Sequence, residues 1–485
     1  MDKRSRAGLP WSVQLWISLW LAGAVPAMAD IHTAQGCLSG EVTASGVLLQ
    51  TRLTAIPGPT LDASSDVPGM AGVVRFEYCE NERFADAIST PWDEVDPASD
   101  FISRVTLSGL RPATVYYYRP VFGKSKDDVR HGAVCRFKTL SGRDEYSAVK
   151  FCVGSCMNYN KFMHGEVAKA SGPITATQQD KRLGYPAFAA MSLLEPDFFV
   201  GTGDIVYYDN ILNGPAETVP QLRQCWHEQF RFPRLIEFFS KTSGYWSKDD
   251  HDFRFDDADR SKSKLPLPQT GIDLFREQLP IHAAGDRSSP TYRTHRIHRH
   301  LQIWLTEGRD YRSANREHDG PGKTLWGKDQ REWLQETLKA SDATWKILIS
   351  PTPMVGPDDA RKIDNHTNLG GFRHEANEFF DWIRANEIGG LMTFCGDRHW
   401  QYHSIHPAGI EEFACGALND ENARRGVKPG AKNGTDPEAL IKQTYTYDAV
   451  TGGFLFVQVS PAEPNPMLVI EFRDDDGNVL HRVRK

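Results

Sequence analysis

The sequence predicts a layered α/β domain that follows a small β-sandwich. Three observations support this. Residues 40–140 contain short strands rich in Val, Tyr and Phe, whereas after residue 146 apolar strands alternate with helical stretches. The tail from Gly453 to Arg484 returns to a β pattern. At 485 residues the chain exceeds the size that one hydrophobic core usually supports, so we expect at least two domains.

The sandwich is predicted over residues 30–142, with strands at 47–52, 73–78 and 115–119 separated by turn residues. The stretch from Leu107 to Arg119 resembles the end of a fibronectin-type-III module, in which a turn leads into a strand of alternating aromatic residues. We interpret these aromatic residues as core packing. A short polar linker then precedes the second domain, which we place at residues 146–485.

The second domain is predicted from apolar strands with helices between them. One helix is expected over 327–340, where Trp333, Leu334 and Leu338 recur near helical spacing. The expected strands of this domain are 149–153, 197–200, 301–305, 345–349 and 390–394.

The first 29 residues have the order of a secretory signal peptide. Basic residues precede an apolar run from Trp11 to Val25, and small residues close it at Ala27 and Ala29. A membrane anchor is the competing interpretation, but it needs an uninterrupted span of about 20 apolar residues. We therefore expect cleavage after Ala29, a periplasmic or extracellular location, and no stable membrane span in the mature protein.

The mature chain is acidic. Removing residues 1–29 takes away three basic side chains and one acidic one, so the formal net charge of -7 becomes -9. Such a balance gives no general attraction to nucleic-acid backbones, so we expect no specific nucleic-acid partner. The oligomeric state is not predicted.

The cysteines fit neither a dense disulfide framework nor a paired zinc motif. Their spacing does not define pairs, and one of them, Cys156, is a candidate metal ligand. The eight positions are 37, 79, 135, 152, 156, 225, 395 and 415.

Four polar clusters follow predicted strands or lie in loops, at the end of an α/β sheet where ligands usually bind. Each alone has an ordinary explanation: a buried cysteine, a turn, a helix-starting run of carboxylates or a structural histidine. Together they offer a thiolate, a phenol, carboxylates and an imidazole, a ligand set suited to iron beside a divalent ion. The clusters are Gly154-Ser155-Cys156, the segment Gly201–Asp209 with Asp204 and Tyr207, Asp249-Asp250-His251-Asp252, and Gly396-Asp397-Arg398-His399.

These clusters, in this order, resemble the PhoD-like (alkaline phosphatase D) family of the calcineurin-like metallophosphoesterase superfamily. The resemblance covers most of the chain and extends to 309–312, 324–334 and 344–346. It implies a four-layer core of two mixed sheets flanked by helices, with the sandwich ahead of it.

The resemblance also implies roles for single residues. Cys156, Asp204, Tyr207 and His399 correspond to ligands of Fe³⁺, with Asp204 bridging to a second metal. Asp250 and Asp397 correspond to the side of that second metal, which is often Ca²⁺. His251 corresponds to a residue that contacts the phosphate or protonates the leaving oxygen.

Arg309 and Arg312 are candidate phosphate clamps, because a guanidinium can bind two phosphate oxygens at once. A structural ion pair is the alternative for each. The sequence departs from the family at Asp256, where many relatives carry Asn, and at Thr306-Glu307-Gly308 before Arg309. Near Asn365 and His366 the chain either lines the pocket or caps a turn.

The predicted activity is hydrolysis of phosphomonoesters, phosphodiesters or both by a metal-bound hydroxide. A phospholipase D-like phosphodiesterase is a second interpretation, since the same pair of metals accepts diesters. A noncatalytic binding protein on the same fold is a third. The natural ester and the second metal are not defined by the sequence.

Overall fold

The computed structural model describes residues 30–165, 176–209, 214–460 and 466–485. The predicted signal peptide, residues 1–29, lies outside the described residues. Among the described residues no helix combines the length and the apolar character needed to cross a membrane.

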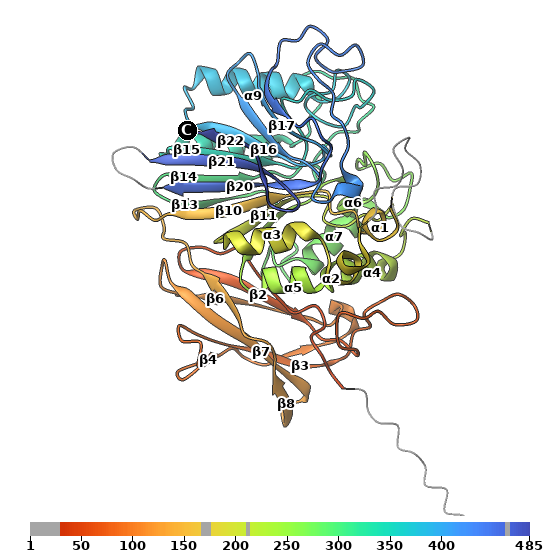
Figure 1. Ribbon diagram of the computed structural model, residues 1–485, viewed down its shortest axis with the longest axis vertical. Coiled ribbons are helices and arrows are strands. Elements are labelled where there is room, and N and C mark those ends of the chain that lie inside the picture. Colours follow the sequence, from red (N-terminus) through yellow and green to blue (C-terminus); the bar gives the residue numbers. More distant parts are fainter. Residues whose placement is uncertain (1–29, 166–175, 210–213, 461–465) are drawn as a thin grey trace, which may run out of the picture.

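Two sheets stack face to face at the centre of the molecule (Figure 1). The larger sheet contains, in order, β22 (Val479–Arg484), β21 (Met467–Asp474), β20 (Gly453–Ser460), β10 (Val149–Gly154), β11 (Phe198–Thr202), β12 (Ser243–Ser247), β1 (Cys37–Gly40), β2 (Gly46–Arg52) and β6 (Ile102–Ser108). The second contains β13 (Arg293–His298), β14 (Leu301–Leu305), β15 (Trp345–Ser350), β16 (Leu391–Cys395), β18 (Glu411–Cys415), β17 (Gln401–Ile405) and β19 (Lys442–Thr446).

Both faces of the larger sheet are buried at β10 and β11, whose successive side chains point to opposite sides. Phe151 and Phe198 pack between the two sheets, whereas Cys152 and Phe199 face helices on the other side. These helices are α3 (Pro186–Leu194), α4 (Val219–Phe230), α5 (Pro233–Phe239) and α7 (Pro268–Gln278), with α1 (Tyr159–His164), α2 (Gln178–Leu183) and α6 (Asp250–Phe253) nearby.

The outer face of the second sheet is covered by α8 (Lys328–Ala340) and α9 (Arg373–Ala385). Leu334 of α8 and Phe379 of α9 belong to the same buried cluster as Trp304 of β14. The layers are therefore helices, sheet, sheet and helices, which confirms the predicted four-layer core. The predicted helix 327–340 and the predicted strands of this domain correspond closely to α8 and to β10, β11, β14, β15 and β16.

The N-terminal part is β-rich, as predicted. Its own sheet contains β4 (Ile88–Ser89), β3 (Gly72–Cys79), β7 (Val115–Ser125) and β8 (Asp128–His131), with β5 (Asp93–Val95) and β9 (Cys135–Lys138) at its side. The remaining N-terminal strands, β1, β2 and β6, extend the larger central sheet, because β1 pairs in parallel with β12 through Gly40 and Gly244. A shared sheet thus connects the two parts of the chain.

A largely buried ion pair lies at this junction. Glu41, directly after β1, binds Arg293 of β13 through Nη2 at 2.5 Å and Nε at 2.7 Å, and His295 Nε2 lies 2.9 Å away. Burial disfavours the Glu41 carboxylate, but Arg293 and His295 outweigh burial and lower its pKa to about 2. The folded state therefore favours charged Glu41 at neutral pH.

We predict that Glu41→Gln destabilises the protein most at neutral pH. A carboxyl whose pKa falls from 4.5 to about 2 on folding stabilises the fold above pH 4.5, and this contribution is lost as pH falls toward 2. Urea unfolding should show a loss of about 3 kcal/mol at pH 7 and about half of that near pH 3.5. Exposed Glu94→Gln is the control and should change little. An equal loss at both pH values would contradict this account.

Candidate metal centre

Three of the predicted ligands have the same unusual backbone. Cys156, Asp204 and Asp397 have φ values of 58°, 56° and 60°, a left-handed conformation that non-glycine residues rarely adopt. Each directly follows or lies near the carboxyl end of a strand, namely β10, β11 and β16. Such conformations persist only where the surrounding structure holds them, and they concentrate at functional sites.

Glycines beside these residues let the loops approach closely. A Cβ at Gly203, which has φ +96°, would lie 2.6 Å from Asp249 Cβ, and a Cβ at Gly396 would lie 2.4 Å from Ser155 Oγ. Both distances are too short for any side chain. Gly203 therefore brings together the ends of β11 and β12 in the larger sheet, and Gly396 brings the end of β16 in the second sheet against the end of β10 in the larger one.

The ligand atoms of Cys156, Asp204 and His399 all lie within 4.8 Å of one another. Cys156 Sγ is 3.4 Å from Asp204 Oδ2, and the Tyr207 hydroxyl is 3.1 Å from the same oxygen and 3.4 Å from His399 Nε2. Four residues from three distant segments of the chain thus converge on one point.

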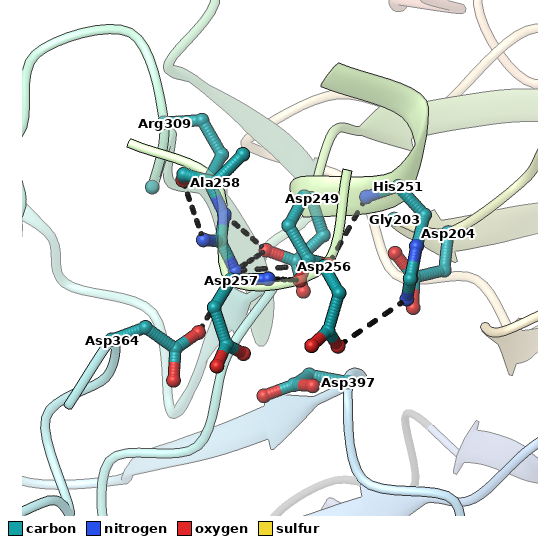
Figure 2. A network of polar contacts seen from close by, with 12 residues as sticks. Gly203, Asp204, Asp249, His251, Asp256, Asp257, Ala258, Arg309, Asp364 and Asp397 are labelled. Atoms are coloured by element: carbon teal, nitrogen blue, oxygen red, sulfur yellow. Dashed lines mark hydrogen bonds and ion pairs between the residues drawn. The ribbon is translucent and has the colours of Figure 1, made fainter. Parts of the chain in front are cut away.

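A second set of ligand atoms joins the first through Asp204, which groups with Asp250 and His251. Asp250 in turn groups with Asp256 and Asp257. Two neighbouring cation sites that share the Asp204 carboxylate fit this arrangement. Among the described residues Asp397 is in none of these groups, although its carboxylate is drawn in the same cluster (Figure 2). The assignment of each residue to a particular ion stays a prediction.

The electrostatics of the site favour a bound cation. Burial and neighbouring acidic groups raise the pKa of Asp204 despite His251, and burial together with Asp364 and Asp250 raises that of Asp397 to about 6 despite Arg398. Buried Asp204 Oδ1 and Asp397 Oδ2 have no hydrogen-bond partner among the described residues. Oxygen atoms of this kind are costly unless a cation or a donor reaches them, so the residues fit a metal site.

Burial, together with Arg424, lowers the pKa of His399 well below its usual value. Its imidazole is therefore neutral at physiological pH, which is the form that coordinates metals. Burial and Asp204 raise the pKa values of the Cys156 thiol and the Tyr207 hydroxyl. A bound cation would lower both of these pKa values, because it favours the thiolate of Cys156 and the phenolate of Tyr207.

His251 lies against the first group of ligands. Its Nδ1 is 2.6 Å from Asp209 Oδ1, and its ring stacks on Tyr207 with centroids 4.1 Å apart. Its Nε2 faces Asp256 Oδ1 at 3.9 Å, too far for a hydrogen bond (Figure 2). Although burial opposes it, Asp250, Asp204 and Asp209 raise the pKa of His251 well above its usual value, so the ring is poised to carry a proton.

Arg309 is fully buried behind the carboxylates (Figure 2). It binds Asp249 Oδ1 through Nη2 at 2.6 Å and through Nε at 2.7 Å, and its Nη2 lies 3.4 Å from Asp364 Oδ2. Its Nη1 donates to the Ala258 carbonyl oxygen at 3.0 Å. In this structure its guanidinium therefore holds the loops that carry the acidic residues. Its predicted role as a phosphate clamp stays a prediction.

Arg312 is also buried. Its Nε donates to the Gly308 carbonyl oxygen at 2.6 Å and its Nη1 to Asn315 Oδ1 at 3.0 Å. Among the described residues its Nη2 has no partner. This second candidate clamp thus retains one unused donor, and its role also stays a prediction.

The sequence departure at Glu307 has a structural basis. The Glu307 carboxylate binds buried Lys248 at 2.9 Å and accepts the backbone N–H of Arg309 at 2.7 Å. Lys248 also binds Asp310 at 2.6 Å. Glu307 therefore fixes the loop that carries Arg309.

Sequence reasoning missed several residues of the site. Asn422 Nδ2 donates to the Cys156 carbonyl oxygen at 3.0 Å and lies 3.1 Å from the Tyr207 hydroxyl oxygen, so it fixes two candidate ligands together. Lys362 pairs with Asp257 and neutralises part of the acidic cluster. No motif marks these positions. Asp209, which orients His251, does lie five residues after Asp204 in a segment already singled out.

We predict that Arg309→Met lowers the free energy of unfolding by about 3–5 kcal/mol, because it leaves buried carboxylates unpaired. In urea unfolding, the double variant Arg309→Met/Asp249→Asn should lose less stability than the two single variants lose together, because the two side chains are in contact. Arg331→Met, which breaks an exposed ion pair with Glu378, should cost less than about 1 kcal/mol. Unchanged stability with a raised KM would instead support the phosphate-clamp role.

Comparison with known proteins identifies two matching family models. Residues 151–450 match the family described as PhoD-like phosphatase, and residues 21–141 match the one described as PhoD-like phosphatase, N-terminal domain. Alkaline phosphatase D of Bacillus subtilis (strain 168) is 21% identical over 465 residues, which cover 87% of this chain and 73% of that protein.

Two solved structures share the fold. A structure of PhoD superposes with a TM-score of 0.69 at 18% identity and covers 94% of this chain and 89% of that one. The purple acid phosphatase PPD1 from yellow lupin (Lupinus luteus) seeds gives a TM-score of 0.59 at 12% identity, with 92% and 73% covered. Both likenesses extend over the sandwich and the four-layer core.

Proposed function

The chain belongs to the PhoD-like phosphatase family, and from this membership we propose that it is an exported hydrolase of phosphomonoesters, phosphodiesters or both. Membership makes it a metal-dependent phosphoric ester hydrolase, so a noncatalytic binding protein is no longer a competing function. The observation that carries the proposal is the convergence of Cys156, Asp204 and His399 within 4.8 Å.

The ligand types support a particular pair of ions. We assign Fe³⁺ to Cys156, Asp204, Tyr207 and His399, because thiolate, phenolate and imidazole suit a transition metal better than calcium. We assign Ca²⁺ to the carboxylates of Asp250 and Asp397, with Asp204 shared, because hard carboxylate oxygens suit it. Bound in this way, the ions would neutralise the buried acidic groups, bind phosphate oxygens and make a water more acidic.

In hydrolysis, a water oxygen forms a bond to phosphorus, the ester P–O bond breaks, and a proton ends on the leaving oxygen. We assign the supply of that proton to His251; the contact of its Nδ1 with Asp209, which leaves Nε2 facing the carboxylate cluster, supports this assignment. Arg309 and Arg398 hold Asp249 and Asp397 in place through ion pairs. Arg312 retains a donor for an anionic ligand.

Export is proposed on the pattern of residues 1–29 alone. Cleavage after Ala29 would make Asp30 the first residue of the mature protein. N-terminal sequencing of protein recovered outside the cytoplasm should therefore start at Asp30, and an intact N-terminus there would refute cleavage.

Replacing the candidate thiolate ligand tests the metal site. We predict that Cys156→Ala loses bound iron and nearly all turnover of p-nitrophenyl phosphate and bis(p-nitrophenyl) phosphate, while its circular dichroism spectrum stays that of the wild type. Cys152→Ala is the matched control, because Cys152 is equally buried but packs against helices away from the site. Full activity and iron content in Cys156→Ala would refute the assignment.

The same two esters separate the two enzymatic interpretations. A wild-type preference for bis(p-nitrophenyl) phosphate would favour the phospholipase D-like phosphodiesterase, and a preference for p-nitrophenyl phosphate would favour a phosphomonoesterase.

A further prediction concerns His251. If His251 supplies a proton to the leaving oxygen, His251→Gln should slow hydrolysis of an alkyl ester such as glycerol 3-phosphate by about 10²–10⁴-fold. It should slow p-nitrophenyl phosphate far less, since p-nitrophenolate leaves without protonation. Steady-state kinetics on both esters measure this difference. Equal losses on the two would show that His251 acts by binding or positioning.

A further inference from the structure

A pocket of about 560 Å³ adjoins the candidate metal centre. Two of its lining residues contact the carboxylates of that centre: Arg398 binds Asp397, and Lys362 binds Asp257. Residues 424–428 and 446–448 also line it. A molecule that reaches the centre from this side therefore passes along the pocket.

The pocket carries more positive than negative charge. Three of its six basic residues form ion pairs with nearby carboxylates. These pairs are Arg361 with Asp359, Arg398 with Asp358 and Asp397, and Lys362 with Asp256 and Asp257. In the described part of the chain, the other three, Arg424, Arg425 and Lys428, form no ion pair, and the remaining acidic residue of the lining is Asp448. This excess stands out in a chain whose formal net charge is -7.

One of these uncompensated cations is fixed beside the centre. The backbone N–H of Arg424 donates to the carbonyl oxygen of His399 at 2.9 Å, and its guanidinium carbon lies 5.5 Å from the centroid of the Trp400 ring. The Tyr447 hydroxyl lies 3.0 Å from the His399 carbonyl oxygen and 2.8 Å from that of Arg424. The wall that carries Arg424 is thus attached to a candidate metal ligand.

An exposed arginine that is packed in place but has no acidic partner, as Arg424 is, suits an anionic ligand. Guanidinium groups bind phosphate through two parallel N–H donors, and a pocket of one charge raises the local concentration of oppositely charged molecules. The phosphate that is hydrolysed has its own ligands in the metal centre. The cations of the adjoining pocket are therefore available to a different anionic group of the same molecule.

We propose that this pocket binds a second phosphate group of the substrate, so that the preferred esters carry one phosphate at the metal centre and another along Arg424, Arg425 and Lys428. This inference rests on the proposed function and narrows its substrate class. A basic surface that is merely solvated is the competing explanation.

The test uses two chromogenic esters that differ by a single phosphate: thymidine 5′-(p-nitrophenyl phosphate) with and without a 3′-phosphate. The wild type, loaded with metals, should show a kcat/KM at least about 10-fold higher for the ester with the 3′-phosphate. The double variant Arg425→Gln/Lys428→Gln should bring this ratio close to 1. Lys126→Gln, in the exposed turn before β8 at the sandwich end of the molecule, should keep the wild-type ratio (Figure 1).

Calorimetric titration with thymidine 3′,5′-bisphosphate provides a readout that does not depend on turnover. Binding to the wild type should weaken about 10-fold in the double variant and remain unchanged in Lys126→Gln. If neither ester is hydrolysed, the proposed function fails on these substrates, while the titration still decides on the pocket. A wild-type ratio near 1, or bisphosphate binding that is equal in wild type and double variant, would overturn the inference.

Discussion

The structure depends on burying a dense group of carboxylates at the meeting point of two sheets. Asp204, Asp249, Asp250 and Asp397 are nearly inaccessible to solvent and lie close enough to repel one another. Like charges in such an environment are strongly unfavourable without compensation. Buried basic side chains such as Arg309 supply part of that compensation. The carboxylate oxygens that still lack a partner favour the binding of metal cations.

This constraint links fold and site. Left-handed residues at Cys156, Asp204 and Asp397 end three strands, and the neighbouring glycines let these ends approach to distances that no side chain would tolerate. Such backbone strain is retained only where the rest of the fold outweighs it. The two stacked sheets, each covered by helices on its outer face, provide that rigidity. The candidate ligands therefore lie at the ends of buried strands of the two central sheets.

Sequence patterns predicted the parts that depend on local periodicity. Apolar strands that end in Gly-Asp or Gly-Ser-Cys indicated both the central sheets and the edge at which polar groups gather. They did not predict β12, because Ser243, Gly244 and Ser247 interrupt its apolar character, nor the pairing of β1 with β12, which joins residues about 200 positions apart. Long-range pairing of this kind leaves no local signal.

The same limit applies to the site. Candidate ligands were recognisable because each belongs to a motif, whereas Asn422 and Lys362 lie in loops without one. Arg309 shows a subtler limit, because an arginine beside a phosphate site and an arginine behind its acidic residues look identical in sequence. Burial and bond partners distinguish the two, and both come from the tertiary structure.

On the proposed assignment, two cations compensate the buried acidic groups. An anomalous diffraction experiment on crystals of the purified protein tests it most directly. We expect two peaks that share Asp204, one within about 2–2.5 Å of Cys156 Sγ and His399 Nε2 and one beside Asp250. A map in which no peak lies within bonding distance of Cys156, Asp204 and His399 would contradict it.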